Sequence, residues 1–388
     1  MSRHHRFKLN ALALAAATVL LGACQTAALQ SPTATSAAAA LSASPVLRQD
    51  AFQGIYEVAV SADATAVFVA TITGFDPQNG GFIHRLDARS LQTLQTTQTP
   101  RRSFALGLNR STNTLYVGNT MEGSLSIVDA SSGVVKGVIQ LAEAKQDAEG
   151  KTSYAHTRKV IVDEKHNRVF VTSPGQPGLI WIVDGATNTL THTITSEGIW
   201  TAGAAYDAGS NRLYVSQGGV HEILEIDPDA GKVVRSFSTG DSTANTSEGA
   251  KHFFINLAID TKGQRLFSTD ANTSQVYVFD IASGSVVKQI PIDGISLLDV
   301  VYNPQRDEIV TTHRGAARSA PTGTGAVTLI DAATYAVKRT IDLPMHPNSL
   351  ALTPDGQTLY VTVKAPHGDK HPGFRKDALD SVVRIDLR

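Results

Sequence analysis

The sequence predicts an all-β fold, a seven-bladed β-propeller with four-stranded blades, and three observations support this prediction. An apolar strand of the type "LYV" recurs seven times at intervals of 43 to 54 residues, which is the period of a propeller blade. The third strand of every unit ends in an aspartate. The last unit contains only three strands, whereas one extra strand precedes the first unit.

The recurring strand is the second of four in each unit. A short apolar strand such as "SLALT" precedes it, and a turn such as "PDGQT" joins the two. A tight turn such as "DASSG" joins the third strand to the fourth. The recurring strands begin at Val67, Leu115, Val169, Leu213, Leu266, Ile309 and Leu359.

The aspartate at the end of the third strand occurs in all seven units. A catalytic residue is needed once, so this repetition indicates a structural role. An aspartate before a tight turn accepts backbone N–H bonds and thereby fixes the hairpin. The seven residues are Asp87, Asp129, Asp184, Asp227, Asp280, Asp331 and Asp386.

The two ends of the repeat region are predicted to close the ring. The chain stops at "SVVRIDLR", after the third strand of the seventh unit. The segment "PVLRQDAF", residues 45–52, is available as the missing fourth strand. Closure in this way removes exposed sheet edges, so we assign residues 45–388 to one propeller domain.

The first 23 residues are typical of an export signal. Three basic residues precede an apolar stretch, residues 11–23, that is too short to span a bilayer. The stretch is followed by Cys24, the only cysteine of the protein, in the string "LGAC". This string resembles the lipobox of bacterial lipoproteins, which implies that residues 1–23 are a lipoprotein signal peptide and that Cys24 is lipidated.

Lipidation of Cys24 would determine the location of the protein. Gln25 follows the cysteine, and the absence of an aspartate there favours the outer membrane over the inner one, with the domain facing the periplasm. Residues 24–44 are rich in Ala, Ser and Thr and carry no charge, so we expect a flexible tether. The alternative is an ordinary signal peptide with an incidental cysteine. A lipidated Cys24 leaves the domain without a thiol, which excludes disulfides and thiol catalysis.

The composition is that of a globular protein without strong net charge. It is 42% hydrophobic, enough for a large core, and its net charge is −1. Loss of Arg3, Arg6 and Lys8 with the signal lowers Lys+Arg from 34 to 31 against 35 Asp+Glu, a net charge of −4. A site for nucleic acid or another anion must therefore be a local patch.

The first strand of each unit alternates between a polar and an apolar set. Ten residues before each "LYV"-type strand we expect the channel lining: Glu57, Ala105, Lys159, Gly203, Asn256, Asp299 and Ser349. The residue after each of these is apolar, and we expect this second set to pack between blades: Val58, Leu106, Val160, Ala204, Leu257, Val300 and Leu350.

Cations and aromatic residues are interleaved in the loops at the channel mouth. In a propeller, the loops before the first strand and after the second open on the same face. Guanidinium groups bind phosphates and aromatic rings stack on bases, so we expect a funnel that binds an anionic ligand, single-stranded DNA among them. The predicted ligand residues are Arg101, Arg102, Phe104, His156, Arg158, Lys159, Trp200, His252, Phe253, Asn256, Arg314, His346 and Asn348. Packing between blades is the alternative for the aromatic residues, and ion pairing is the alternative for the arginines.

The repeats resemble YVTN-type propeller repeats, and three longer strings resemble the YncE family of secreted bacterial propellers. These strings are "HFFIN" (residues 252–256), "IWIVDG" (180–185) and "HPNSLALTPDGQTLYVTVK" (346–364). The resemblance covers residues 45–388 and implies a non-enzymatic, periplasm-facing propeller that binds single-stranded DNA. The lipobox departs from the plain cleavable signal of that family.

Three alternatives remain at the sequence level. One is a protein-interaction scaffold at the cell envelope. Another is a lyase or hydrolase, since Glu57, Lys159 and Asp299 are predicted to line one polar channel. The third is a metal site formed by His367, Asp369 and His371. No nucleophile elbow and no haem-attachment motif occurs, so we expect a non-catalytic protein without a cofactor. We also expect the protein to be a monomer.

Overall fold

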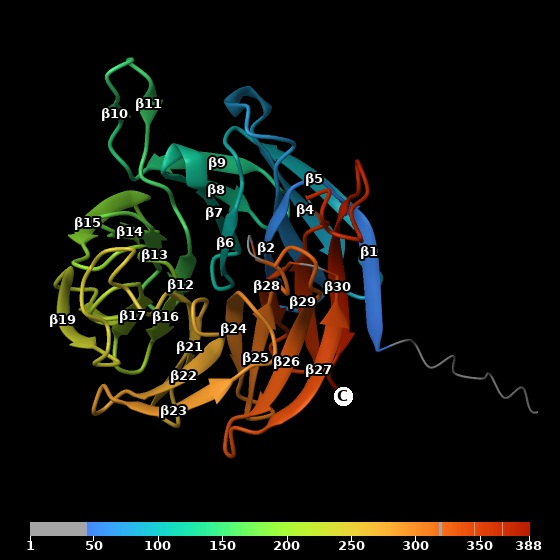
Figure 1. The fold of residues 1–388 in the computed structure, drawn as a ribbon. Coiled ribbons are helices and arrows are strands. Elements are labelled where there is room, and N and C mark those ends of the chain that lie inside the picture. Colours follow the sequence, from blue (N-terminus) through green and yellow to red (C-terminus); the bar gives the residue numbers. More distant parts are fainter. Residues whose placement is uncertain (1–44, 318–319, 345, 367) are drawn as a thin grey trace, which may run out of the picture. The chain divides into compact units, whose positions relative to one another are not determined.

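The computed structural model describes residues 45–317, 320–344, 346–366 and 368–388, and it confirms the seven-bladed β-propeller. Seven four-stranded antiparallel sheets follow one another around a central axis (Figure 1). Residues Ser44–Arg388 form one compact unit. With its own core and a closed ring, this unit is expected to fold on its own.

Six blades contain four consecutive strands each. The first three are β2–β5 (Ile55–Val60, Ala66–Thr71, Gly81–Asp87, Thr93–Thr99), β6–β9 (Ala105–Asn109, Thr114–Asn119, Ser124–Asp129, Val135–Gln140) and β12–β15 (Val160–Asp163, Arg168–Ser173, Leu179–Asp184, Thr189–Thr195). The next three are β16–β19 (Ala204–Asp207, Arg212–Ser216, Ile223–Asp227, Lys232–Phe237), β20–β23 (Phe254–Asp260, Arg265–Asp270, Gln275–Asp280, Val286–Pro291) and β24–β27 (Leu297–Asn303, Glu308–His313, Gly325–Asp331, Val337–Leu343).

The seventh blade joins the two ends of the repeat region, as predicted. It consists of β28 (Pro347–Leu352), β29 (Thr358–Val363), β30 (Asp380–Asp386) and the N-terminal β1 (Val46–Phe52). Strand β1 pairs antiparallel with β30 as its outermost neighbour. The ring is therefore closed by main-chain hydrogen bonds between the first and last strands.

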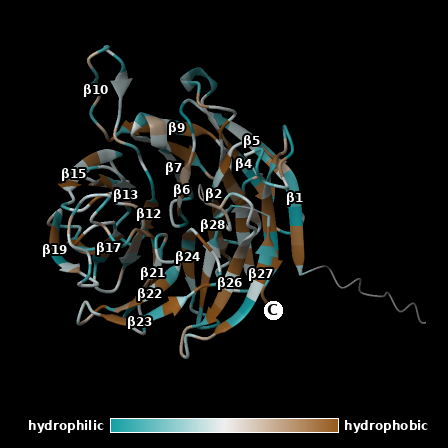
Figure 2. Cartoon of the chain, viewed as in Figure 1, coloured by the Kyte–Doolittle hydropathy of each residue, from teal (hydrophilic) through white to brown (hydrophobic). Residues whose placement is uncertain are grey.

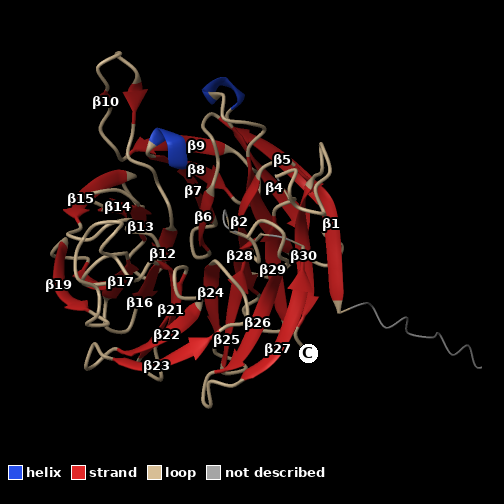
Figure 3. Ribbon diagram, viewed as in Figure 1, coloured by secondary structure: helices blue, strands red, loops and turns tan. Residues whose placement is uncertain are grey.

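Elements outside the blades are few. A small hairpin, β10 (Lys145–Gln146) and β11 (Thr152–Ser153), projects from the ring (Figure 3). The described residues also contain two 3₁₀-helices, η1 (Pro77–Asn79) and η2 (Thr120–Glu122). Within the described part of the chain, no helix has the length and apolar character needed to cross a membrane.

The core lies between adjacent blades and is supplied mainly by the second and third strands (Figure 2). Every residue of β3 and β7 is buried, because blades pack on both of their faces. The apolar set of the innermost strands is buried as predicted, with exposures between 2% and 6%. These contacts fix the orientation of the polar set toward the channel.

The repeated aspartates have the structural role predicted for them. In Asp129, Oδ1 accepts hydrogen bonds from the backbone N–H groups of Ser131 (3.2 Å) and Ser132 (3.0 Å). Asp87 and Asp331 accept the corresponding pairs of bonds in their own turns. The six turns that join a third strand to a fourth each contain at least one bond of this type. Asp386, which no fourth strand follows, accepts the N–H of Arg388.

Replacing Asp129 by alanine is expected to lower the free energy of unfolding by about 1 kcal/mol at neutral pH. The backbone bond from Ser132 and the nearby Lys136 hold the pKa of Asp129 well below its usual range. A carboxyl with a lowered pKa stabilises the fold above its unfolded pKa of about 3.9, and this contribution is lost as the pH falls toward the folded value.

Urea denaturation of both proteins checks this expectation. The difference in unfolding free energy should narrow as the pH is lowered from about 6 to about 2. The variant Asp129→Asn retains an acceptor oxygen and should lose less stability than the alanine variant. A difference that does not change with pH would contradict the role assigned to the carboxylate.

Candidate functional site

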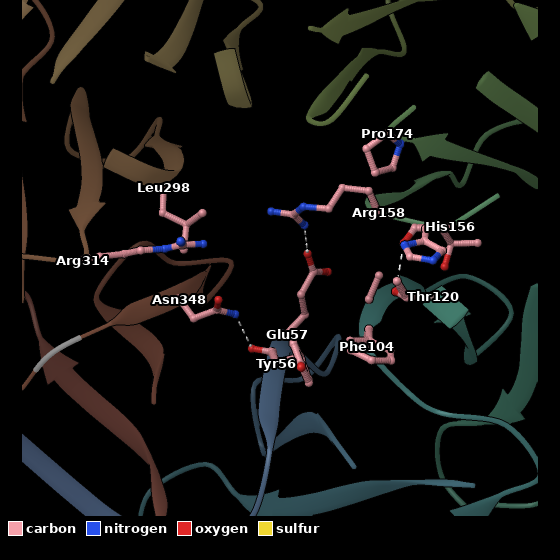
Figure 4. Close-up of a pocket in the computed structure, with 12 residues that line it drawn as sticks. Tyr56, Glu57, Phe104, Thr120, His156, Arg158, Pro174, Leu298, Arg314 and Asn348 are labelled. Carbon is pink, nitrogen blue, oxygen red and sulfur yellow. Dashed lines mark hydrogen bonds and ion pairs between the residues drawn. The ribbon is translucent and has the colours of Figure 1, made fainter. Parts of the chain in front are cut away.

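A cavity of about 310 Å³ opens at the mouth of the channel (Figure 4). Its walls come from the innermost strands and from the loops before the first strand and after the second strand of several blades. Arg158 and Arg314 point into it from opposite sides, and Tyr56 and Glu57 lie between them. The remaining lining residues are Phe104, Ala105, Thr120, His156, Thr157, Pro174, Leu298 and Asn348.

A second cavity of about 510 Å³ continues the first one toward the seventh blade. The two cavities share Tyr56, Arg314 and Asn348, so they form one recess, called here the central funnel. His346 and Lys364 line the second part only. The funnel is thus large enough for a ligand of nucleotide size.

A recurring backbone bulge positions the cations of the funnel. Ser296 and His346 have positive φ angles of 58° and 64°, and the strands that follow them, β24 and β28, each contain a register shift. The carbonyl groups of Ser296 and His346 accept hydrogen bonds from the backbone N–H groups of Arg314 (3.1 Å) and Lys364 (3.0 Å). The residue after each second strand is therefore held at the rim.

The same bulge explains the glycine in the first blade. Gly54 has a φ of 62°, and a Cβ atom there would lie 2.3 Å from the carbonyl oxygen of Ile72. Glycine is the residue that adopts this conformation without strain. Gly54 and Tyr56 both line the second part of the funnel.

The floor of the funnel is a charged network around Glu57. Its Oε1 lies 3.2 Å from Nζ of Lys159 and 3.3 Å from a guanidinium nitrogen of Arg158. Its Oε2 accepts the backbone N–H of Leu106 at 3.0 Å, which ties the first blade to the second. The Glu57 side chain is 8% exposed, so one buried carboxylate binds two cations and a neighbouring blade.

Burial and neighbouring charges compete in this network. Burial lowers the pKa of Lys159, but Glu57 and Asp299 outweigh it, and the net shift is upward. Burial raises the pKa of Asp299, which Lys159 and the backbone N–H of Leu350 only partly oppose. Oδ2 of Asp299 accepts that N–H at 2.8 Å, and Oδ1 accepts the N–H of Val300 at 3.0 Å.

Two cations of the funnel differ from those of the floor. The half-buried guanidinium of Arg314 has no hydrogen-bonded or ion-paired side-chain partner within the described ranges, and burial and Arg158 lower its pKa. Burial lowers the pKa of Lys364 to about 8. The Lys364 ammonium lies 3.7 Å from the ring centroid of Tyr56 and donates to the carbonyl of Ile55 at 2.5 Å.

Aromatic rings lie beside these cations. The rings of Tyr56 and Phe104 are 4.2 Å apart between centroids and inclined by 53°. Nδ2 of Asn348 donates to the carbonyl of Tyr56 at 3.0 Å, which connects the seventh blade to the first. Cations and two rings therefore face a common space, an arrangement that suits a ligand with both anionic and flat apolar parts.

The structure brings most predicted ligand residues to the funnel. These are Phe104, His156, Arg158, Arg314, His346 and Asn348, with Lys159 in the floor. Several lining residues are not among the predicted ligand residues, and they include Tyr56, Thr120, Pro174 and Lys364. Lys364 ends a string already associated with the family, but its sequence neighbours do not reveal that it lies over Tyr56.

Three predicted ligand residues have other partners in the structure. Arg102 forms an ion pair of 2.7 Å with Glu122, and its side chain is 8% exposed. Arg101 donates to Oε1 of Gln140 at 2.7 Å in the outermost strand of the second blade. His252 is fully buried between two aspartates. None of these three residues lines either of the two cavities.

The remaining predicted ligand residues, Trp200, Phe253 and Asn256, lie outside the two cavities. Trp200 and Phe253 form an edge-to-face pair with centroids 5.2 Å apart, and Trp200 is 38% exposed. Asn256 is buried in the channel, where its Nδ2 donates to the carbonyl of Leu298 at 2.9 Å. Trp200 and Phe253 belong to the loops before β16 and β20, and their rings pack against each other while part of the Trp200 surface stays exposed.

The predicted metal site near residue 370 is not supported by the residues that can be described. His367 and Cys24 lie outside the described residues. Nε2 of His371 contacts the carbonyl of Gly323 at 3.1 Å, and Nδ1 contacts the N–H of Gly373 at 3.0 Å. Both ring nitrogens of His371 are engaged with the main chain, and Asp369 is exposed.

The fold and funnel define a β-propeller protein, and comparison with known proteins shows its family. The chain is 35% identical over 347 residues to the uncharacterized protein YncE of Salmonella typhi, covering 89% of this chain and 92% of that protein. It is 33% identical over 345 residues to YncE of Escherichia coli K12, with the same coverage. The chain therefore belongs to the YncE family.

Solved structures agree on the fold. The crystal structure of the RRP9 WD40 repeats matches with a TM-score of 0.65 and 12% identity over 88% of this chain and 97% of that one. U3-55K matches with a TM-score of 0.64 at 12% identity, covering 89% and 99%. At this identity the likeness concerns the fold alone. No protein-family model matches the sequence.

Proposed function

We propose that this propeller is a non-catalytic binding protein of the bacterial envelope that holds an anionic ligand, single-stranded nucleic acid in particular, in the central funnel. The observation that supports this most directly is Arg314. Its guanidinium lies half-buried at the funnel wall without a carboxylate partner in the described part of the chain. A desolvated cation of this kind gains most from a phosphate or carboxylate of a ligand.

The surroundings of Arg314 favour a nucleotide over a simple inorganic ion. Lys364 supplies a second cation over the Tyr56 ring, and Phe104 extends the aromatic surface. Stacking of a base on such a ring contributes about 1–3 kcal/mol without selecting a sequence. A duplex would shield its bases, so a single strand fits this surface better.

The acidic residues of the floor are consistent with a binding role. Glu57 and Asp299 each accept a backbone N–H from a neighbouring blade, and this bond orders the channel wall. An acid or base in catalysis must instead reach a substrate proton. We therefore assign these carboxylates to the architecture of the funnel.

The envelope part of the proposal comes from the N-terminal sequence. A lipid on Cys24 would tether the propeller through residues 24–44 to the outer membrane, facing the periplasm. Mass spectrometry of the N-terminal peptide checks this modification.

Binding of a labelled single-stranded oligonucleotide to the unit Ser44–Arg388 tests the function. Fluorescence anisotropy should show an affinity that falls with salt, with a slope of log K against log[salt] of about −2 for three cations in contact with phosphates. A hairpin duplex of the same length should bind more weakly. Absence of binding at low salt, or equal binding of both forms, would contradict the proposal.

A further inference from the structure

A second polar cluster lies in the loops of the fourth and fifth blades, apart from the funnel. Glu222 directly precedes β18, whereas Asp241 and His252 belong to the long loop between β19 and β20. One potential ligand atom from each of the three residues lies within 4.8 Å of the others. They are 11 to 30 residues apart in sequence, so only the fold brings them together.

The histidine of this cluster is oriented by a carboxylate behind it. Nδ1 of His252 lies 2.6 Å from Oδ2 of Asp270, and neither side chain is exposed. Nε2 points in the opposite direction, to 2.7 Å from Oδ1 of Asp241. A carboxylate that holds one imidazole nitrogen and directs the other toward acidic oxygens is the outer-shell arrangement found around metal-binding histidines.

The carboxylates of Glu222 and Asp241 both lie close to the hydroxyl of Thr239. The hydroxyl of Thr239 lies 2.6 Å from Oε1 of Glu222 and 2.6 Å from Oδ1 of Asp241. Glu222 is fully buried, and its other contacts are with the N–H of Thr239 and the hydroxyl of Ser242. No cation forms an ion pair with Glu222 among the residues described.

The charges of the cluster are unbalanced. Three carboxylates, those of Glu222, Asp241 and Asp270, face one imidazole and the ammonium of Lys251, which pairs with Asp241 at the surface. Even with both cations charged, one negative charge remains in a region where Glu222, Asp270 and His252 are shielded from water. A buried excess of negative charge is costly unless a cation compensates it.

We propose that Glu222, Asp241 and His252 form a binding site for a divalent first-row transition-metal ion of the Zn²⁺ type. The ion takes the place of the proton between His252 and Asp241, and Asp270 holds the Nδ1–H of the ring. One nitrogen and two carboxylate oxygens suit Zn²⁺, whereas an imidazole is a poor ligand for Ca²⁺.

The geometry of the site is compatible with such an ion. Ligand atoms that bind one Zn²⁺ tetrahedrally at about 2.0–2.2 Å lie about 3.3–3.6 Å from one another. The three candidate atoms lie within 4.8 Å of one another, and Nε2 of His252 is 2.7 Å from Oδ1 of Asp241, so a shift of about 1 Å in the Asp241 loop closes the site. The Asp241 side chain is 44% exposed, which leaves a route for the ion and a position for water. Asp241 also lies on a loop, which adapts more easily than a strand.

Calorimetry on the unit Ser44–Arg388, freed of tags and treated with chelator, tests the site. We expect one Zn²⁺ per chain and a rise in Tm of several degrees when the ion is added. Asp241→Asn, at an exposed position, should fold normally and weaken binding by at least about 30-fold. Asp270→Asn should weaken it by about 10–100-fold, as expected for a second-shell residue.

The matched control is Asp147→Asn, which neutralises an exposed aspartate near the distant β10–β11 hairpin and should leave Zn²⁺ affinity unchanged. Co²⁺ absorption gives an independent readout of a nitrogen ligand, and it should disappear in His252→Ala. Oligonucleotide binding should be unaffected by Asp241→Asn, which separates this site from the funnel. Absence of stoichiometric binding, preference for Ca²⁺, or unchanged affinity in Asp241→Asn would overturn the proposal.

Discussion

Replacing Arg314 by alanine is expected to reduce the affinity for a single-stranded oligonucleotide by about 30- to 150-fold at low salt. Hydrogen bonds to a charged group contribute about 2–3 kcal/mol when they are shielded from water, and the guanidinium of Arg314 is half-buried. Anisotropy titrations of both proteins at one salt concentration measure the effect. Circular dichroism melting should show that the variant remains folded, because only the main chain of Arg314 takes part in the rim bulge.

Two further variants identify the cause of that loss. Arg314→Lys retains the charge but not the planar fork, so it should recover only part of the affinity if the ligand is a phosphate held by two bonds. Arg339→Ala removes an exposed positive charge from β27 of the same blade and should have almost no effect. An equal loss in Arg314→Ala and Arg339→Ala would indicate general electrostatic attraction and would refute the funnel site.

Replacing Glu57 by glutamine is expected to reduce the free energy of unfolding by about 3 kcal/mol, because Lys159 and Arg158 then lose their common carboxylate in a poorly solvated channel. The side chains of these two cations are 18% and 30% exposed, so water compensates only part of the loss. Glutamine has nearly the same shape and still accepts the N–H of Leu106. Chemical denaturation at neutral pH measures the difference.

A double variant and a surface variant serve as controls for the Glu57 prediction. Glu57→Gln combined with Lys159→Met removes both charges and should recover a large part of the lost stability. Glu164→Gln breaks the pair with Arg110, whose side chains are 33% and 44% exposed, and should cost less than about 1 kcal/mol. A similar loss for Glu57→Gln and Glu164→Gln would show that the channel network has no special energetic role.

Much of the fold could be predicted from the sequence because the propeller repeats a local pattern. The period of the "LYV"-type strands gave the number of blades, and the missing strand at the end predicted the closure by β1. The aspartate before each outer turn acts on atoms two or three residues away, so its role depends on local geometry alone. Alternation along the innermost strands similarly separated the channel face from the packed face.

The candidate site could be predicted only in part, since it depends on partners from other loops and blades. The sequence placed Arg102, Arg158 and Arg314 on one face but not their environments. Arg102 is paired with Glu122, 20 residues away, whereas Arg158 shares a carboxylate from a position 101 residues away. Of these three arginines, Arg314 alone has no carboxylate partner among the described residues, a distinction that no pattern of spacing contains.

The cluster around His252 shows the same limit. The string "HFFIN" indicated the family and drew His252 into the predicted funnel, but its imidazole is buried between Asp241 and Asp270. The sequence by itself determined the repeat, the ring and the structural aspartates, because these follow from an apolar pattern and from short-range hydrogen bonds that recur in each unit. The tertiary structure decided which charges are paired, because an ion pair depends on the distance between two side chains that the folding of separate loops or blades brings together.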